Sequence, residues 1–235
     1  MKDILKKIIY KHKYSSEAYI QYLKNKGMRI GKGTVIFAPR NVTIDETRPW
    51  LIEIGNNVQI TKNVTILTHG YDWSVLKEKY GDVLGSSGKV KIGDNCFIGM
   101  NATILKGINI GKNVIIGANS LVNKDVPDNV VIAGNPAKVI MTIEEYYEKR
   151  KKQQLGEAIS LAKEYYKVYQ KKPPKNIFHE YFWLFEIRDE NILEGSYKEV
   201  MNLVNNYDQS IEKFKLSKPI FGSYEEFLNA CELDK

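Results

Sequence analysis

An aliphatic residue recurs at every sixth position through the middle of the chain. Six consecutive positions keep this period: Ile92, Ile98, Ile104, Ile110, Ile116 and Val122. The fourth residue after each is mostly small or β-branched: Cys96, Ala102, Ile108, Val114 and Ser120. The period fits neither an α-helix, with 3.6 residues per turn, nor a strand that alternates every second residue. It is typical of a parallel β-solenoid, in which three six-residue sides make one coil of about 18 residues.

Glycine directly follows four of these six aliphatic residues. We expect the aliphatic side chains to point inward and stack into a continuous core. We expect the glycines to lie at corners, where the turn would strain a residue that has a Cβ atom.

The same period begins earlier, in a different phase. It runs from Ile30 through Val42 to Ile66 and is broken once, at residues 45–50. Ile66 and Ile92 are 26 residues apart, which is not a multiple of six. An insertion must lie between them, and we place it at residues 70–89. Long loops in compact domains often carry function.

The N-terminal segment is predicted to be helical. It carries apolar residues at helical spacing: Ile4, Leu5, Ile8 and Ile9. Ser15 or Ser16 is a candidate N-cap for a second helix, and Gly27 is a candidate C-cap residue. We favour a helix pair packed over one end of the solenoid. The alternative is a basic amphipathic helix that contacts a membrane surface.

The C-terminal segment is also predicted to be helical. Thr142, with Glu145 in the first turn, is typical of a helix start, and the basic helix that follows is expected to end near Gln170. Residues 176–235 are rich in aromatic residues and suggest short helices. We favour a packed cap or subunit contact for them, with a carbohydrate-contacting aromatic surface as the alternative.

These patterns divide a mainly β chain into three parts. An N-terminal helical segment covers residues 1–28, and the β-solenoid covers residues 29–141 with the inserted loop 70–89. A helical C-terminal extension covers residues 142–235.

Composition favours a cytoplasmic protein. The hydrophobic content of 43% is enough for a core, and the two cysteines, Cys96 and Cys231, do not indicate a disulfide framework. No apolar run approaches the ~20 residues of a membrane-spanning helix, and no secretory signal is expected.

The formal charge of +7 is unevenly distributed. Residues 1–33 carry nine Lys/Arg against two acids, and residues 138–175 carry ten against five. Basic ends attract nucleic acid, an anionic membrane surface or a phosphorylated ligand. The aromatic and basic motif of an RNA-recognition module is absent from the sequence, so nucleic acid is not an expected partner.

His69 is the only histidine in the repeat region, and it stands at the start of the inserted loop. A histidine on the surface of a solenoid is often inert. Its position beside a long loop favours a functional role, because histidine is well suited to proton abstraction near neutral pH.

The repeats resemble a known superfamily. Residues 64–73 (VTILTHGYDW) and 92–140, with the loop between them, resemble the left-handed β-helix acyltransferases with hexapeptide repeats. Within it they are most similar to the galactoside, maltose and polysaccharide O-acetyltransferases. The resemblance implies a left-handed parallel β-helix that forms homotrimers, with acetyl-coenzyme A bound between neighbouring solenoids.

The resemblance also implies a mechanism. His69 matches the catalytic histidine and would remove the proton from an acceptor hydroxyl, whose oxygen then attacks the thioester directly. Backbone N–H groups would stabilise the oxyanion. The positions that match cofactor-contacting residues are Phe97, Gly99, Met100, Gly117, Ala118, Asn123, Lys124 and Lys138.

Three residues are candidates for the acceptor side. Asp45 matches an acceptor-binding carboxylate, Asp72 is a candidate for orienting the imidazole, and Trp73 for stacking on a sugar. Pro39 replaces a polar acceptor ligand of the small-sugar enzymes, and the C-terminal tail is far longer than theirs. These departures favour a larger bacterial surface glycan, such as capsule, lipopolysaccharide or a precursor.

Two alternatives remain, and a third is not expected. The acceptor could be an amine, as in N-acetyltransferases with the same fold and donor. The chain could be a binding solenoid without activity. A zinc enzyme like the carbonic anhydrases on this solenoid needs three histidines per metal, and only His69 is in the repeats, so no metal is expected.

Overall fold

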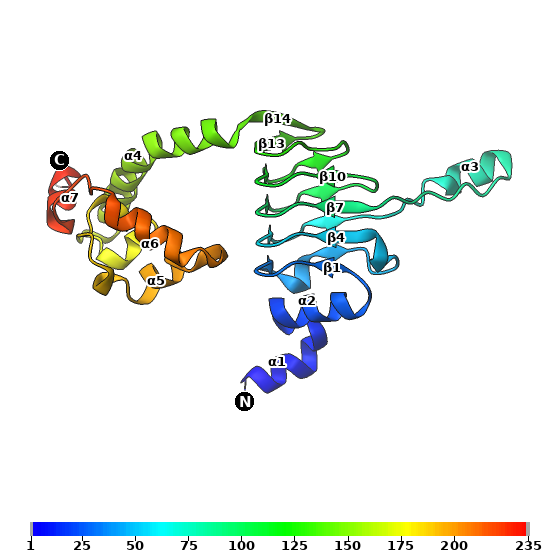
Figure 1. The fold of residues 1–235 in the computed structure, drawn as a ribbon, viewed down its shortest axis with the longest axis horizontal. Helices are drawn as coiled ribbons and strands as arrows, with labels where there is room; N and C mark the ends of the chain where they lie inside the picture. The colour runs from blue at the N-terminus through cyan, green and yellow to red at the C-terminus, as the bar shows by residue number, and fades with distance from the viewer. Residues whose placement is uncertain (1, 234–235) are drawn as a thin grey trace. The chain divides into compact units, whose positions relative to one another are not determined.

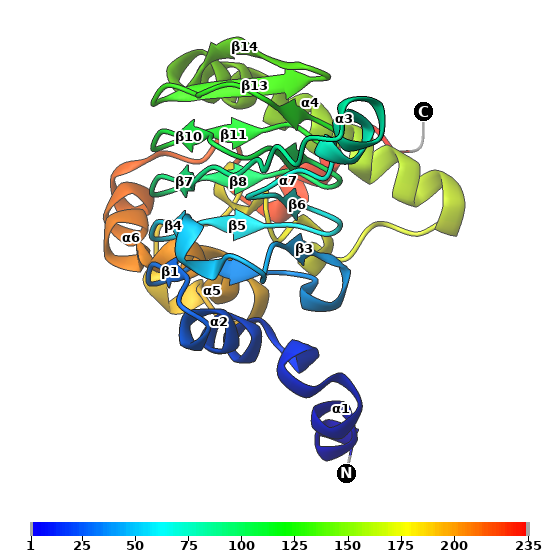
Figure 2. The same ribbon diagram turned by 90° about the vertical axis from the view of Figure 1, so that its right-hand side faces the viewer.

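Short parallel strands stack into three sheets through most of the chain's first half, as Figures 1 and 2 show. The computed structural model describes residues 2–233, and the side chains of residues 6–233. It has two units, Met1–Tyr146 and Tyr147–Lys235. The first unit contains the sheets and the second is helical.

Each sheet takes one strand from each coil. The first sheet contains β1 (Arg29–Ile30), β4 (Ile52–Ile54), β7 (Val90–Ile92) and β10 (Asn109–Ile110). The second contains β2 (Val35–Ile36), β5 (Gln59–Ile60), β8 (Phe97–Ile98), β11 (Ile115–Ile116), β13 (Val130–Gly134) and β14 (Ala137–Thr142). The third contains β3 (Thr43–Ile44), β6 (Thr65–Ile66), β9 (Thr103–Ile104) and β12 (Leu121–Val122). Only β13 and β14 pair antiparallel among the described strands.

The register confirms a parallel solenoid with three sides. Ile92 pairs with Ile110, which is 18 residues later, and Ile98 pairs with Ile116 at the same separation. All six aliphatic residues of the period from Ile92 to Val122 are exposed by 1% or less. The predicted core is therefore present, and burying each such side chain contributes about 1.5–3 kcal/mol.

Asparagine forms most of the left-handed corners, although Gly33 and Gly107 also have positive φ, of 70° and 80°. Asn63, Asn101 and Asn119 have φ of 61°, 61° and 59°, and the side-chain amide of Asn63 donates to Asn101, whose amide donates to Asn119. The glycines that follow the aliphatic residues instead permit close stacking of coils. A Cβ atom on Gly93 would lie 2.6 Å from the backbone of Gly111. The expectation that these glycines relieve strained corners was therefore wrong.

The first coil is longer than 18 residues, and two of its extra residues lie between Ile36 and Ile44. The six-residue period marks Val42 as the aliphatic residue that follows Ile36, but the structure pairs Ile44, not Val42, with Ile66. The short 3-10 helix η2 (Pro39–Asn41) occupies the preceding corner and accounts for the extra length. Val42 is still buried, because it takes the place that Val64 has in the next coil.

Two helices and a 3-10 turn precede the first strand: α1 (Lys2–Tyr10), η1 (Lys11–Tyr14) and α2 (Ser16–Asn25). Ser15 caps α2 by accepting a hydrogen bond from the Ala18 N–H, as predicted, and Gly27 has a φ of +107°. From α2, the fully buried Tyr19 and Leu23 join the solenoid core. The side chains of Ile4 and Leu5 lie outside those that the structure describes.

The inserted loop contains a helix that was not predicted, α3 (Trp73–Tyr80). Thr68 and Gly88 are joined by a backbone hydrogen bond at its base, and His69 forms a β-bridge with Ser87. Figure 1 shows α3 extending away from the sheets, and none of its residues is buried.

The second unit has its own aromatic core. Thr142 caps the long helix α4 (Ile143–Tyr169), and its hydroxyl accepts from the Glu145 N–H. The shorter elements are η4 (Lys175–Phe178), η5 (Phe182–Leu184), η6 (Glu190–Ile192), α5 (Gly195–Met201), η7 (Leu203–Asn205), α6 (Tyr207–Leu216) and α7 (Tyr224–Ala230). The predicted short helices are therefore present. Of the residues described, no helix is long and apolar enough to cross a membrane.

Candidate functional site

The side chains of Asp45 and His69 meet at the carboxyl ends of β3 and β6. Asp45 Oδ2 lies 2.6 Å from His69 Nδ1. The Asp45 side chain is 4% exposed and that of His69 is 22% exposed. The carboxylate is thus buried behind the imidazole, and the ring is at the surface.

Protein donors saturate the Asp45 carboxylate. Oδ1 accepts from the Thr47 N–H at 3.0 Å and from the Thr47 hydroxyl at 2.6 Å. Oδ2 accepts from the Thr68 hydroxyl and from the Thr68 N–H, in addition to His69. Burial by itself would raise the pKa of Asp45, but these hydrogen bonds outweigh it and hold the pKa well below its usual value. Asp45 is therefore ionised at neutral pH.

An ionised carboxylate accepts hydrogen bonds and cannot donate them. In the neutral imidazole, the proton must then be on Nδ1, which leaves the lone pair of Nε2 available. Buried carboxylates orient catalytic histidines in this way and stabilise the imidazolium that forms when Nε2 takes a proton. The geometry suits His69 for general base chemistry.

The backbone around Asp45 and His69 is stabilised by hydrogen bonds to the third sheet, to α2 and to the inserted loop. The Asp45 N–H donates to the Ile66 carbonyl within the third sheet. Glu46, the next residue, accepts from Tyr19, Tyr22 and Lys26, which are all on or beside α2. On the loop side, Arg48 donates to the Ser86 carbonyl.

The structure changes the roles expected of two acids. Asp45 was expected to bind the acceptor, but its oxygens are already occupied by protein donors. Asp72 was expected to orient the imidazole, and this was wrong because Asp45 makes that hydrogen bond. Asp72 instead precedes α3 on the exposed loop, where its Oδ1 lies over Gly70. Trp73 follows it, with its ring 5.5 Å from that of Tyr71.

Two of the expected cofactor residues share an edge with His69. Val122 stacks on Ile104, which stacks on Ile66, so Asn123 and Lys124 extend from the same end of the third sheet. With adjacent strands about 4.8 Å apart, Lys124 lies two coils, roughly 10 Å, along the solenoid from Thr68.

Four others lie at the opposite edge of the third sheet. Met100 and Ala118 occupy the corners that precede β9 and β12, and both are exposed. Gly99 and Gly117 directly precede Met100 and Ala118. A Cβ atom on Gly99 would lie 2.6 Å from the backbone nitrogen of Ala118 in the next coil. Close stacking of coils therefore explains these glycines without a ligand.

The remaining two lie on the second sheet. The Phe97 ring is 42% exposed on β8, and Lys138 is on β14, paired with Ala133. A six-residue side spans roughly 20 Å at 3.3 Å per residue, so one chain does not bring His69 and Met100 together.

Sequence reasoning missed three residues at the His69 edge. Thr47 and Thr68 supply four of the five hydrogen bonds to Asp45. Lys106 lies between Thr68 and Lys124 in the stack. The 18-residue coil length identifies Lys106 as the equivalent of Lys124, whereas the threonines have no sequence signal of this kind.

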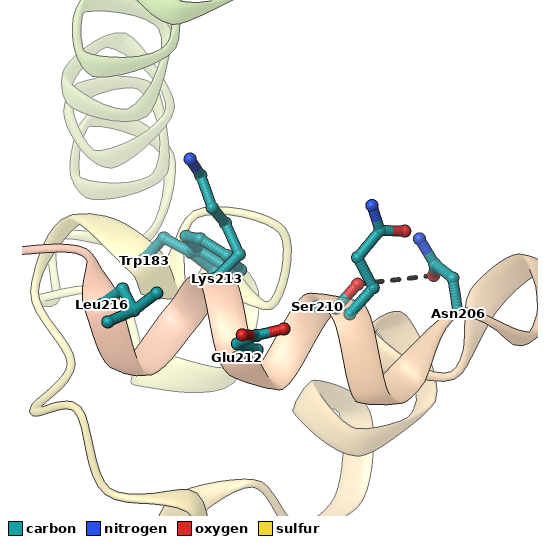
Figure 3. A pocket seen from close by; sticks show the side chains of 7 residues that line it. Trp183, Asn206, Ser210, Glu212, Lys213 and Leu216 are labelled. Atoms are coloured by element: carbon teal, nitrogen blue, oxygen red, sulfur yellow. Dashed lines mark hydrogen bonds between the residues drawn. The ribbon is translucent and has the colours of Figure 1, made fainter.

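A separate groove lies on the helical unit. Its volume is about 440 Å³, and it is lined by Trp183, Asn206, Gln209, Ser210, Glu212, Lys213 and Leu216. Figure 3 shows Trp183, Lys213 and Leu216 toward one end and Ser210 and Asn206 toward the other. Among the aromatic residues considered for carbohydrate contact, Phe178, Phe182 and Phe185 are buried in the core. Only Tyr181 and Trp183 are partly exposed, and a carbohydrate surface there stays a prediction.

Comparison with known proteins shows which family the repeats resemble. Residues 89–124 match the family described as hexapeptide repeat of succinyl-transferase. Protein CapG of Staphylococcus aureus is 42% identical over 44% of this chain and 59% of its own length. A galactoside O-acetyltransferase of Lactococcus lactis is 38% identical over 58% of this chain and 65% of its own.

A third relative is WbbJ of Escherichia coli K12, provisionally named a lipopolysaccharide biosynthesis O-acetyl transferase. It is 34% identical over 48% of this chain and 65% of its own length. The chain therefore spans about three fifths of these curated relatives. The predicted resemblance to hexapeptide-repeat acyltransferases is confirmed.

Replacing Asp45 tests the hydrogen-bond network. We expect Asp45→Asn to lower the free energy of unfolding at pH 7 by about 1–3 kcal/mol, because an amide NH2 would face donors. The folded-state pKa of Asp45 is depressed, so its contribution is present above the unfolded value near 3.9 and is lost as pH falls below it. Denaturant unfolding at several pH values measures this difference.

The difference between wild type and Asp45→Asn should be constant from neutral pH to about 5 and should shrink below about 4. Asp82→Asn, at an exposed position of the inserted loop, is the control and should change stability little. A difference that does not vary with pH would show that the Asp45 carboxylate is not held by these bonds.

Proposed function

We propose that this hexapeptide-repeat protein is an acetyl-coenzyme A-dependent O-acetyltransferase whose acceptor is a sugar hydroxyl of a bacterial surface glycan or its precursor. The observation that carries the proposal is the Asp45–His69 pair, in which an ionised, buried carboxylate holds a surface imidazole. The relatives named as O-acetyltransferases support the reaction class.

His69 Nε2 is the proposed general base. It takes the proton of the acceptor hydroxyl as that oxygen forms a bond to the thioester carbonyl carbon. The tetrahedral intermediate then collapses, the carbon–sulfur bond breaks, and the imidazolium returns the proton to the departing thiolate. Asp45 stabilises the imidazolium between these two steps. No nucleophilic serine or cysteine is required.

The donor, acetyl-coenzyme A, is proposed to lie along the left-handed solenoid. Met100 and Ala118 are exposed corner residues whose backbone can approach the pantetheine arm and thioester, and Phe97 is exposed nearby. Lys124 and Lys138 form no ion pair within the described residues, so their charges are available for phosphates.

The active site is proposed to form between subunits of a homotrimer. His69 and Lys124 lie at one edge of the third sheet, and Met100 and Ala118 lie at the other. A groove between two copies joins the first edge of one with the second edge of its neighbour. The exposed inserted loop, with Trp73, would then line the acceptor side of the groove.

The chain is proposed to divide into a helical segment 1–28, a solenoid 29–141 and an extension 142–235 that contributes no residue to the proposed chemistry. A cytoplasmic location is supported by two free, buried cysteines, Cys96 and Cys231.

Replacing the proposed base tests the mechanism. We expect His69→Ala to lower kcat by about 10²–10⁴ while the secondary structure and oligomeric state are unchanged, because Nε2 acts in the transition state. Thiol release from acetyl-coenzyme A is measured with galactoside, oligosaccharide and amino-sugar acceptors.

His179→Ala, at an exposed histidine of the helical unit, is the matched control and should keep full activity. Undiminished turnover by His69→Ala would rule out the general base. Transfer to amino sugars alone would favour an N-acetyltransferase.

Mixing two inactive variants tests the shared site. His69→Ala lacks the base, and Ala118→Trp places a bulky ring at the exposed corner where the pantetheine arm is proposed to bind. When the two are unfolded and refolded together, some grooves pair an intact His69 with an intact Ala118, so activity should reappear. Mass spectrometry shows whether mixed trimers form. If they form and stay inactive, His69 and Ala118 act together within one chain, and the shared site is ruled out.

A further inference from the structure

We propose that the N-terminal segment, residues 6–14 with Arg40 beside it, docks the protein on an anionic lipid membrane surface. The proposal does not depend on acetyl transfer. It rests on exposed apolar side chains, a concentration of cations on the same short segment, and the connection of this segment to the solenoid.

The apolar side chains that the structure describes in α1 and η1 are exposed rather than packed. Ile8 is 69% exposed and Ile9 is 58% exposed, and neither belongs to the solenoid core. Tyr10 and Tyr14 are 37% and 38% exposed. Isoleucine enters the acyl boundary of a bilayer, and tyrosine is enriched at the level of the headgroups.

Cations surround these side chains. Residues 1–33 carry nine Lys/Arg against Asp3 and Glu17. Lys7 lies over the Tyr14 ring at 5.3 Å, and Arg40 lies over the Tyr10 ring at 4.2 Å. The cations therefore flank the apolar residues closely, as in helices that lie on anionic membranes.

A hollow continues the basic surface to the base of the solenoid. It has a volume of about 370 Å³ and lies between η1 and the corner that contains η2. Lys13 and Arg40 line it together with Ser15, Ser16 and one acid, Glu17. The hollow therefore carries a net positive charge, which suits the binding of a lipid phosphate group.

The charge favours a membrane over a second copy of the chain as the partner of this surface. Packing α1 against its counterpart would bring two strongly basic segments together and bury their lysines. An anionic leaflet neutralises the same charges while it covers Ile8 and Ile9.

The segment is joined to the proposed active site. It leads through Ser15 into α2, where Tyr19 and Tyr22 donate hydrogen bonds to Glu46. Glu46 adjoins Asp45, which holds His69. Docking through α1 would therefore fix the orientation of the His69 edge relative to the membrane, which suits an acceptor that is attached to lipid.

Vesicle co-sedimentation of the full chain tests the proposal. The probes are vesicles of phosphatidylcholine alone and vesicles that also contain phosphatidylglycerol. We expect binding only to the anionic vesicles, and release at high salt. Lys7→Gln with Lys11→Gln should weaken binding by at least about tenfold, because each lysine adds to the electrostatic attraction toward an anionic surface. Ile8→Gln with Ile9→Gln should weaken it similarly.

Matched exposed substitutions elsewhere are the controls. Val75→Gln with Val83→Gln removes equally exposed apolar side chains from the inserted loop, and Lys91→Gln with Lys112→Gln removes two exposed lysines from the solenoid. Both should bind as wild type does. Equal binding to both vesicle types, or full binding by the α1 variants, would overturn the proposal. So would a lower oligomeric state of Ile8→Gln with Ile9→Gln without loss of vesicle binding, which would assign the surface to self-association.

Discussion

The buried carboxylate of Asp45 is the group on which the candidate site depends. It accepts five hydrogen bonds from three residues of two neighbouring coils, and these bonds keep it ionised despite burial. A buried charge with this many donors is costly to remove, because each donor would be left without a partner. The arrangement fixes the orientation of His69 and the nitrogen that carries its proton.

The regular part of the solenoid supplies rigidity, and its interruptions carry the candidate catalytic pair, Asp45 and His69. Six stacked aliphatic residues from Ile92 to Val122 and two asparagine ladders hold the later coils in register. The two earlier coils contain the broken repeat with Asp45 and the insertion that follows His69. Because the proposed base and the proposed cofactor-contacting corners lie at opposite edges of the third sheet, the proposed site requires two copies of the chain.

The solenoid could be predicted from the sequence because its period is local and repeats many times. The site was predictable only in part. His69 stood out as the histidine of the repeats beside an insertion, but the candidate for orienting its ring was Asp72, three residues away in sequence. The true partner is Asp45, which is brought to His69 by the pairing of Ile44 with Ile66. That pairing depends on two extra residues at the η2 corner, which the six-residue period does not reveal. Likewise, α3 was not predicted because its exposed residues lack an apolar face of helical period.

The central claim is that Asp45 holds His69 with its proton on Nδ1 and its Nε2 lone pair free. Long-range ¹H–¹⁵N correlation spectroscopy of the histidine rings tests it most directly, with the His69 signals identified by their loss in His69→Ala. The account predicts that the neutral His69 ring carries its proton on Nδ1, as the contact with the ionised Asp45 requires. A neutral ring protonated on Nε2 would contradict it.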